Sequence, residues 1–152
     1  MRQPVQVLVY VTCQGQFLLL HRTARGDDFW QGVTGGVEGD ETVLAAAWRE
    51  LHEETGFEPE HLVDLAFTYA FPVAERWRHL YAADVTEIVE HTFLARVPDV
   101  AEPRIDPREH DDWRWCGFDE AVRLLSWPDN IAALRRARDL ESETCSATKT
   151  TS

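Results

Sequence analysis

The segment from Gly35 to Phe57 constrains the fold of this chain more strongly than any other part of the sequence. It contains the one long helical pattern of the first half, from Thr42 to Thr55. Thr42 or Asp40 can cap the start of this helix, and Gly56 is the glycine that commonly follows a helix end. Because strand-like runs lie on both sides of the segment, we expect the helix to pack on a sheet.

The rest of the chain combines strand-like runs with two further helical patterns. The apolar periodicity predicts strands near residues 5–12, 17–21, 29–34, 61–71, 80–84, 89–97 and 113–116, and later helices at 119–125 and 128–140. This order predicts an α/β (α+β) fold. We expect one domain over residues 1–140. Residues 141–152 form a polar tail that is too poor in large apolar groups to fold alone, and we expect it to be flexible.

Charge and composition argue against several classes of protein. A net charge of −12 disfavours nucleic acid as a partner, because a polyanion would be repelled at long range. The first strand-like run is shorter than the roughly 20 apolar residues of a membrane span and lacks signal-peptide features, so we expect no membrane association. The three cysteines form no CxxC pattern, which favours a cytoplasmic protein without a zinc site. We expect structural roles for histidines 21, 52, 61, 91 and 110, which have no ligand spacing.

Three carboxylates of the first helix carry the chemical signal. Glu50, Glu53 and Glu54 share one helix face, where three like charges are costly unless a cation lies among them. Oxygen ligands of this kind favour a hard ion, Mg²⁺ or Mn²⁺, which can clamp phosphate oxygens and activate water. A neighbouring helix face is apolar and is expected to anchor the helix in the core; it consists of Leu44, Ala47 and Leu51.

Two further residues of the segment support a metal site. Gly35 lacks a Cβ, which lets the backbone approach a ligand or metal closely. We interpret Arg49 as a buried partner of Glu41 or Glu53 that orients a carboxylate, rather than as a phosphate ligand. The spacing G-x5-E-x7-R-E-L-x-E-E-x-G-F matches the Nudix box at all nine specified positions, so the chain resembles the Nudix hydrolases. This resemblance implies an α/β/α sandwich with a mixed sheet and metal-dependent hydrolysis of a phosphoanhydride bond.

The resemblance extends beyond the box to the bacterial dihydroneopterin triphosphate pyrophosphatases, also described as dATP pyrophosphohydrolases. It is carried by residues 28–38, 81–86, 90–93, 109–110 and 126–127. It implies that Glu50, Glu54 and Glu109 ligate Mg²⁺, and Gly35 and Glu53 are the further candidate metal ligands. It also implies substrate contacts, for which the candidates are Arg2, Arg22, Thr34, Phe71 and Ser126. Glu53 is our first choice as general base, with Glu50 and Arg49 completing the catalytic set.

Several alternatives stay open at this stage. The main hypothesis is cleavage of a nucleoside or pterin triphosphate to a monophosphate and pyrophosphate. A diadenosine polyphosphate hydrolase or a general (d)NTP-cleaning hydrolase would use the same metal helix with a different pocket. A Nudix-fold binding module without catalysis is disfavoured, because every acidic position of the box is present. Isopentenyl diphosphate isomerases share the fold, but their extra metal and cysteine features are not apparent. The protein could be a monomer or a homodimer.

Overall fold

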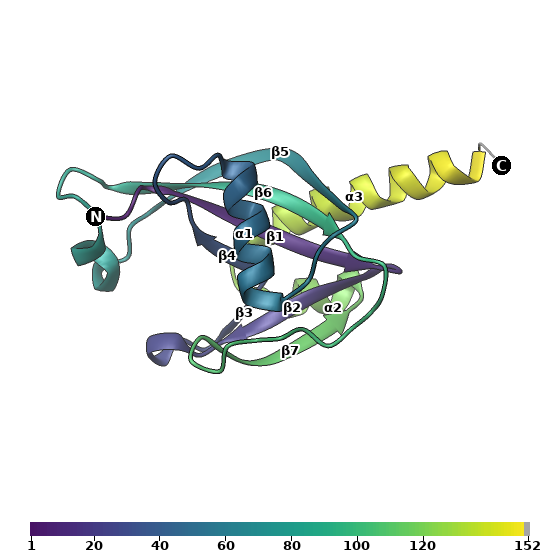
Figure 1. The fold of residues 1–152 in the computed structure, drawn as a ribbon, viewed down its shortest axis with the longest axis horizontal. Helices are drawn as coiled ribbons and strands as arrows, with labels where there is room; N and C mark the ends of the chain where they lie inside the picture. The colour runs from purple at the N-terminus through teal and green to yellow at the C-terminus, as the bar shows by residue number, and fades with distance from the viewer. Residues whose placement is uncertain (151–152) are drawn as a thin grey trace.

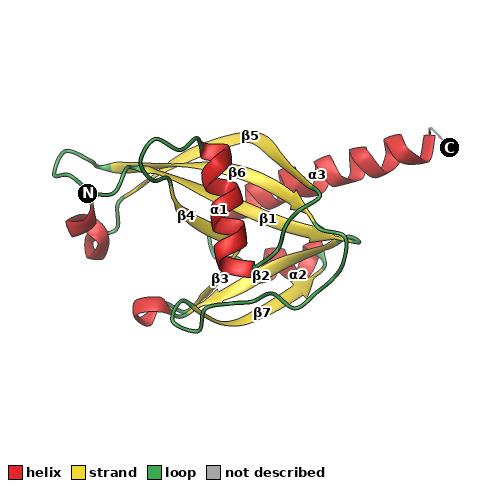
Figure 2. Cartoon of the chain, viewed as in Figure 1, coloured by secondary structure: helices red, strands yellow, loops and turns green. Residues whose placement is uncertain are grey.

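Strand β1 (Val5–Cys13) lies at the centre of a seven-stranded sheet in a computed structural model, which describes residues 1–150, with side chains to residue 143. The strands follow the order β3-β2-β1-β6-β5, while β4 pairs with β1 and β7 with β2 (Figure 2). The β1–β6 pair is parallel and the other pairs are antiparallel, so the sheet is mixed. The remaining strands are β2 (Gln16–Arg22), β3 (Phe29–Gln31), β4 (Val33–Gly36), β5 (His61–Pro72), β6 (Glu87–Arg96) and β7 (His110–Cys116).

Helices cover both faces of the sheet. Helix α1 (Val43–Thr55) crosses one face, and α2 (Phe118–Leu124) and α3 (Pro128–Thr150) lie against the other (Figure 1). Alternate residues of β1 enter two cores, because successive side chains of a strand point to opposite faces. One core joins Val7, Val9 and Val11 to Ala46, Ala47 and Leu51, and the other joins Leu8 and Tyr10 to Ala133, Leu134 and Ala137. The expected α/β/α sandwich is confirmed.

Helix α1 begins and ends where the sequence predicts. The Thr42 hydroxyl accepts a hydrogen bond from the Ala45 amide at 3.0 Å, and Gly56 adopts a left-handed conformation (φ 77°) at the other end. Ala47 and Leu51 are buried as predicted. Leu44 is not part of this core: it is 44% exposed, because the first turn of the helix contacts the core through Val43 and Ala46 instead.

The strand predicted at residues 80–84 is wrong. A short 3-10 helix, η2 (Glu75–Leu80), precedes this segment, and a turn follows in which the Val85 amide donates to the Ala82 carbonyl. The Arg78 guanidinium closes the same turn by donating to the carbonyls of Val85 (2.7 Å) and Ala83 (3.2 Å). The carbonyls of Ala82, Ala83 and Val85 therefore bond within the turn, and the Leu80 carbonyl accepts from the Arg2 amide, so these backbone groups are satisfied without a strand.

Helix α3 is longer than the sequence predicts. It was expected to end near Leu140, but it continues through Thr150, and Figure 1 shows it projecting beyond the sheet. Glu141, the first residue of the predicted tail, forms an ion pair with Arg96 of β6, which ties this part of the helix to the domain. Among the described residues, no helix has the length and apolarity that a bilayer span requires.

Candidate metal and catalytic site

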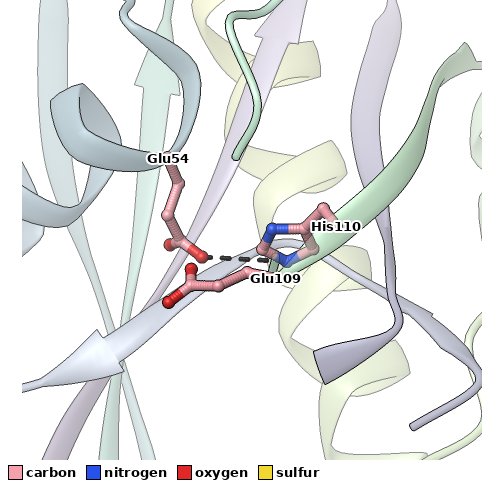
Figure 3. A group of neighbouring side chains, drawn as sticks. All are labelled: Glu54, Glu109 and His110. Carbon is pink, nitrogen blue, oxygen red and sulfur yellow. Dashed lines mark ion pairs between the residues drawn. The ribbon is translucent and has the colours of Figure 1, made fainter. Parts of the chain in front are cut away.

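Three potential ligands meet where α1 faces the start of β7. They are Glu54, Glu109 and His110, whose ligand atoms all lie within 4.8 Å of one another (Figure 3). Glu109 is held by its backbone, since its carbonyl accepts hydrogen bonds from the amides of Thr23 (2.9 Å) and Ala24 (3.2 Å). The site therefore joins a helix to a loop that lies more than fifty residues later in the chain.

Glu54 is the most deeply buried carboxylate of this group. It is 5% exposed, and its Oε2 has no hydrogen-bond partner among the described residues. Its Oε1 lies 3.8 Å from His110 Nε2. Burial raises the pKa of Glu54 well above its ordinary value, and the negative charges of Glu50 and Glu109 raise it further. An ionised carboxylate in this position is costly unless a cation compensates it, so the donor set fits a hard divalent ion such as Mg²⁺ or Mn²⁺.

Glu50 lies one helical turn before Glu54, against the backbone of β4. A Cβ placed on Gly35 would overlap the carboxylate of Glu50, so the glycine makes room for this side chain. Burial raises the pKa of Glu50 to about 7, and the charges of Glu53 and Glu109 act in the same direction. Arg49 opposes this rise by donating to Glu50 at 2.8 Å. Glu50 is thus held one turn from Glu54, with its carboxylate against Gly35 of β4.

Arg49 connects the carboxylates of this segment. Its guanidinium donates to both oxygens of Glu41 (2.7 and 3.2 Å), to Glu53 (3.2 Å) and to the Gly36 carbonyl (2.8 Å). The hydrogen bond with Glu41 is the main cause of the raised pKa of Arg49, and the same bond lowers the pKa of Glu41. The prediction that Arg49 is a partner of Glu41 or Glu53 is confirmed, because it contacts both.

Glu53 differs from the other two carboxylates of the helix face. Its side chain is 57% exposed and is turned toward Arg49 at 3.2 Å. It does not belong to the group of Glu54, Glu109 and His110. The structure thus brings two predicted ligands, Glu54 and Glu109, directly together, whereas direct metal ligation by Glu53 stays a prediction.

Two of the predicted substrate residues lie beside this cluster. A backbone hydrogen bond from Thr34 of β4 lowers the pKa of Glu54, which places Thr34 next to the buried carboxylate. Arg22 ends β2, and its positive charge also lowers the pKa of Glu54. Its Nε donates to Asp27 at 2.8 Å, and Asp27 is in turn paired with Arg76 of η2 at 2.5 Å. Buried Asp27 therefore joins two arginines at the edge of the site.

The other three predicted substrate residues lie on separate elements. Arg2 is exposed, and its amide donates to the Leu80 carbonyl, which places it beside η2. Phe71 is half-buried near the end of β5 and packs against a small apolar cluster with Val73, Tyr81 and Ile88. Ser126 is exposed between α2 and α3. Among the described residues, no hydrogen bond or ion pair joins these three to the carboxylates of the cluster, so their substrate contacts stay predictions.

His110 is a residue of the cluster that sequence reasoning missed, because it was expected to have only a structural role. The Gln31 amide donates to its Nε2 at 3.2 Å. Burial lowers the pKa of His110 to about 4, so the ring is neutral near pH 7. The sequence did contain one signal, because His110 directly follows the predicted ligand Glu109. Glu109 precedes β7 and His110 is its first residue, so the two side chains are not forced to opposite faces of a strand.

Comparison with known proteins identifies the family. A model of the NUDIX domain matches residues 1–137. The chain belongs to the Nudix family. This Nudix hydrolase is 36% identical over 137 residues to the dihydroneopterin triphosphate diphosphatase of Escherichia coli, an overlap of 86% of this chain and 90% of that protein. It is 33% identical over 138 residues to the protein of the same name from Haemophilus influenzae, with 88% and 85% covered.

A solved structure supports the same relationship. The E. coli dihydroneopterin triphosphate pyrophosphohydrolase has a TM-score of 0.77 to this chain at 32% identity, over 89% of this chain and 94% of that chain. The family and these relatives together identify the chain as an enzyme that hydrolyses a small phosphate-containing substrate with a divalent metal ion.

Proposed function

We propose that this enzyme hydrolyses dihydroneopterin triphosphate to dihydroneopterin monophosphate and pyrophosphate in the presence of Mg²⁺, with Mn²⁺ as an alternative ion. The observation that carries this proposal is the identity of 36% and 33% to two diphosphatases of that substrate over most of each chain. The buried carboxylates support it, because hard cations held by oxygen ligands suit phosphoanhydride hydrolysis.

The metal ligands in this proposal come from three segments. Glu50 and Glu54 would hold the ion from α1, and Glu109 from the loop before β7. The Gly35 carbonyl and Glu53 are further candidates. Oε2 of Glu54 supports the assignment, since it is a buried oxygen without a hydrogen-bond partner among the described residues. Bound Mg²⁺ would neutralise phosphate charge and lower the pKa of a water molecule.

The protein residues orient the substrate and accept the proton of the attacking water. We assign the phosphates to Arg22 and Arg2, and Thr34 to the adjoining part of the substrate. The water would form a P–O bond at the α- or β-phosphorus while the bond to the leaving group breaks, and its proton would pass to a carboxylate. We assign this general-base role to Glu53, because it is exposed and Arg49 holds its side chain at 3.2 Å.

We place the ring of the substrate away from its phosphates, near Phe71 and Ser126.

We further propose a cytoplasmic location, which is supported by two free, buried cysteines, Cys13 and Cys116. The net charge of −12 supports a small-molecule substrate rather than a nucleic acid.

A product-resolved substrate screen tests the proposed function. Purified enzyme with Mg²⁺ is incubated separately with dihydroneopterin triphosphate, nucleoside triphosphates, dinucleoside polyphosphates and ADP-ribose, and the kcat/KM of each is measured. We expect dihydroneopterin triphosphate to have the highest value. A higher value for a diadenosine polyphosphate or for many (d)NTPs would replace the proposal with one of the other hydrolases. Binding without hydrolysis of any compound would contradict the enzymatic assignment.

A further inference from the structure

Glu90 is a second buried glutamate, and the proposed chemistry does not use it. It lies in the middle of the sheet on β6 and is 3% exposed. Its two oxygens accept hydrogen bonds from the Gln6 amide and the Tyr69 hydroxyl. No ion pair to Glu90 occurs among the residues that the structure describes, so its charge is balanced by neutral donors alone. A buried carboxylate without a cation lowers the stability of the fold. Its presence therefore suggests a role in binding.

The strand registers place Glu90 on the same sheet face as the proposed substrate residues. Gln6 pairs with Glu90 across β1–β6, and Glu90 pairs with Tyr69 across β6–β5. Phe71, two residues after Tyr69, shares its face because strand side chains alternate. On the other side of β1, Thr34 of β4 pairs with Leu8. Leu8 follows Gln6 by two residues and therefore shares its face of the sheet. Glu90 thus lies between the position proposed for the phosphate-proximal part of the substrate and that proposed for its ring.

The start of α3 lies over the same face. The Asn130 side-chain amide donates to the Tyr69 hydroxyl at 2.9 Å, and the Tyr10 hydroxyl donates to the Asn130 carbonyl at 2.7 Å. Trp127, one turn before Asn130, is 46% exposed and packs edge-on against Phe29. The rings of Tyr69 and Phe71 have centroids 6.5 Å apart. A flat heterocycle held near Phe71 and Ser126 would therefore have aromatic side chains around it and a carboxylate toward the sheet.

We propose that Glu90, aligned by Gln6 and Tyr69, accepts two parallel hydrogen bonds from the ring edge of a 2-amino-4-oxopyrimidine, the edge that pterin and guanine share. This edge carries a ring N–H beside an amino group, and a carboxylate can accept from both at once. Each Glu90 oxygen has a further lone pair beyond the bond it already accepts. Adenine presents an acceptor nitrogen beside its amino group, so one of the two contacts would become repulsive.

This inference rests on the proposed function for the position of the ring, and it deepens that function by naming the group that selects the ring. It predicts a preference for pterin and guanine substrates over adenine substrates. Sites that hydrogen-bond a polar group reject analogues that lack it by large factors, about 10⁴ in favourable cases. We expect a smaller but clear effect here, about 10²-fold, because one hydrogen bond of the pair is changed.

Equilibrium binding of pterin and lumazine tests the proposal on the unchanged protein. These two ring systems differ in the group at C2, where pterin carries an amino group and lumazine an oxo group, and lumazine accordingly also carries a proton on N1. Their dissociation constants are measured by fluorescence titration. We expect pterin to bind at least about 30-fold more tightly than lumazine. Equal affinity for the two, or no binding of pterin, would overturn the proposal.

Two variants extend the same titration. Glu90→Gln should bind pterin and lumazine within about threefold of each other, because the amide presents a donor to the ring edge. Glu87→Gln is the matched control, since Glu87 is an exposed glutamate of the same strand, and it should retain the wild-type preference. A preference that persists in Glu90→Gln would overturn the proposal. If Glu90→Gln does not fold, as judged by circular dichroism, the wild-type comparison of pterin and lumazine decides alone.

Hydrolysis of dihydroneopterin triphosphate by the same preparations separates this inference from the proposed function. Hydrolysis without discrimination between pterin and lumazine would refute the role of Glu90 and leave the proposed function intact. Discrimination without hydrolysis would refute the proposed function and support Glu90 as the selective residue.

Discussion

The carboxylate of Glu50 occupies the space where a Cβ of Gly35 would lie. This relationship explains why a glycine is needed fifteen residues before Glu50, a proposed metal ligand of the helix. Any side chain on residue 35 must displace the Glu50 carboxylate, and small displacements of catalytic groups are costly.

Replacement of Gly35 by alanine should therefore lower kcat by about 10²-fold. Gly36→Ala is the matched control, because no atom lies within 4 Å of a Cβ built at that neighbouring glycine. Steady-state kinetics of both variants, with circular dichroism to verify folding, make the comparison. Similar activity in the two variants would show that the contact between Gly35 and Glu50 does not matter for catalysis.

Glu54→Gln should remove most activity without loss of the fold. A neutral amide is a poor ligand for a hard cation, so we expect kcat to fall by more than about 100-fold. The variant should be at least as stable as wild type in EDTA, because the substitution removes a buried, uncompensated carboxylate. Addition of Mg²⁺ should raise the melting temperature of wild type but not that of Glu54→Gln. An equal rise in both proteins, measured by differential scanning fluorimetry, would place the metal elsewhere.

Arg49→Lys should impair catalysis although the charge is retained. Lysine has no planar fork and cannot serve Glu41, Glu50 and Glu53 together, so we expect kcat to fall by about 10- to 100-fold with a smaller change in KM. Arg138→Lys serves as the control, because Arg138 pairs with its exposed neighbour Asp139 and stacks on Phe118, and it contacts no carboxylate of the cluster among the described residues. Wild-type kcat in Arg49→Lys would mean that the guanidinium does not position the carboxylates.

Several of these features follow from the sequence alone. The caps at Thr42 and Gly56 and the partnership of Arg49 with Glu41 depend on local chemistry or on a motif with fixed spacing. The approach of Glu109 to Glu54 was expected only from the resemblance to relatives outside the motif. The bridge from Arg22 through Asp27 to Arg76 could not be predicted, because Arg76 lies in η2, far along the chain from Asp27, and their approach depends on the folded sheet.

Other features escaped prediction for different physical reasons. The bonds of Glu90 with Gln6 and Tyr69 depend on strand registers, and a glutamate in a strand pattern gives no sign of its burial. Residues 80–84 form no strand, because the Arg78 side chain donates hydrogen bonds to the backbone carbonyls of Ala83 and Val85. An argument from strand propensity does not include such contacts.

The stability of the protein should depend on pH through Glu90. Burial raises the pKa of Glu90 above its ordinary value of 4.5, although hydrogen bonds from Tyr69 and Gln6 partly oppose this rise. The folded protein therefore retains a proton that the unfolded chain has released, and this contribution to stability is lost as pH rises from 4.5 through the folded pKa. In total, the free energy of unfolding falls by about 1.4 kcal/mol for each pKa unit by which the folded value exceeds the unfolded value.

Urea unfolding of wild type and Glu90→Gln from pH 4.0 to 8.5, in EDTA, measures this difference, because the range begins below the ordinary pKa of 4.5. The free energy of unfolding of wild type should decrease relative to that of Glu90→Gln as pH rises. Glu87→Gln, which changes an exposed residue, should parallel wild type. A constant difference between wild type and Glu90→Gln would show that Glu90 has the same pKa in the folded and unfolded states.

Hydrolysis of dihydroneopterin triphosphate in ¹⁸O-labelled water tests the central claim most directly, since the metal cluster of α1 and β7 is proposed to direct water at a specific anhydride bond. The products are separated and their masses measured by mass spectrometry. We predict dihydroneopterin monophosphate and pyrophosphate as the primary products, with one ¹⁸O atom in one of them according to the phosphorus attacked. Orthophosphate and a pterin diphosphate as the primary products would contradict the account.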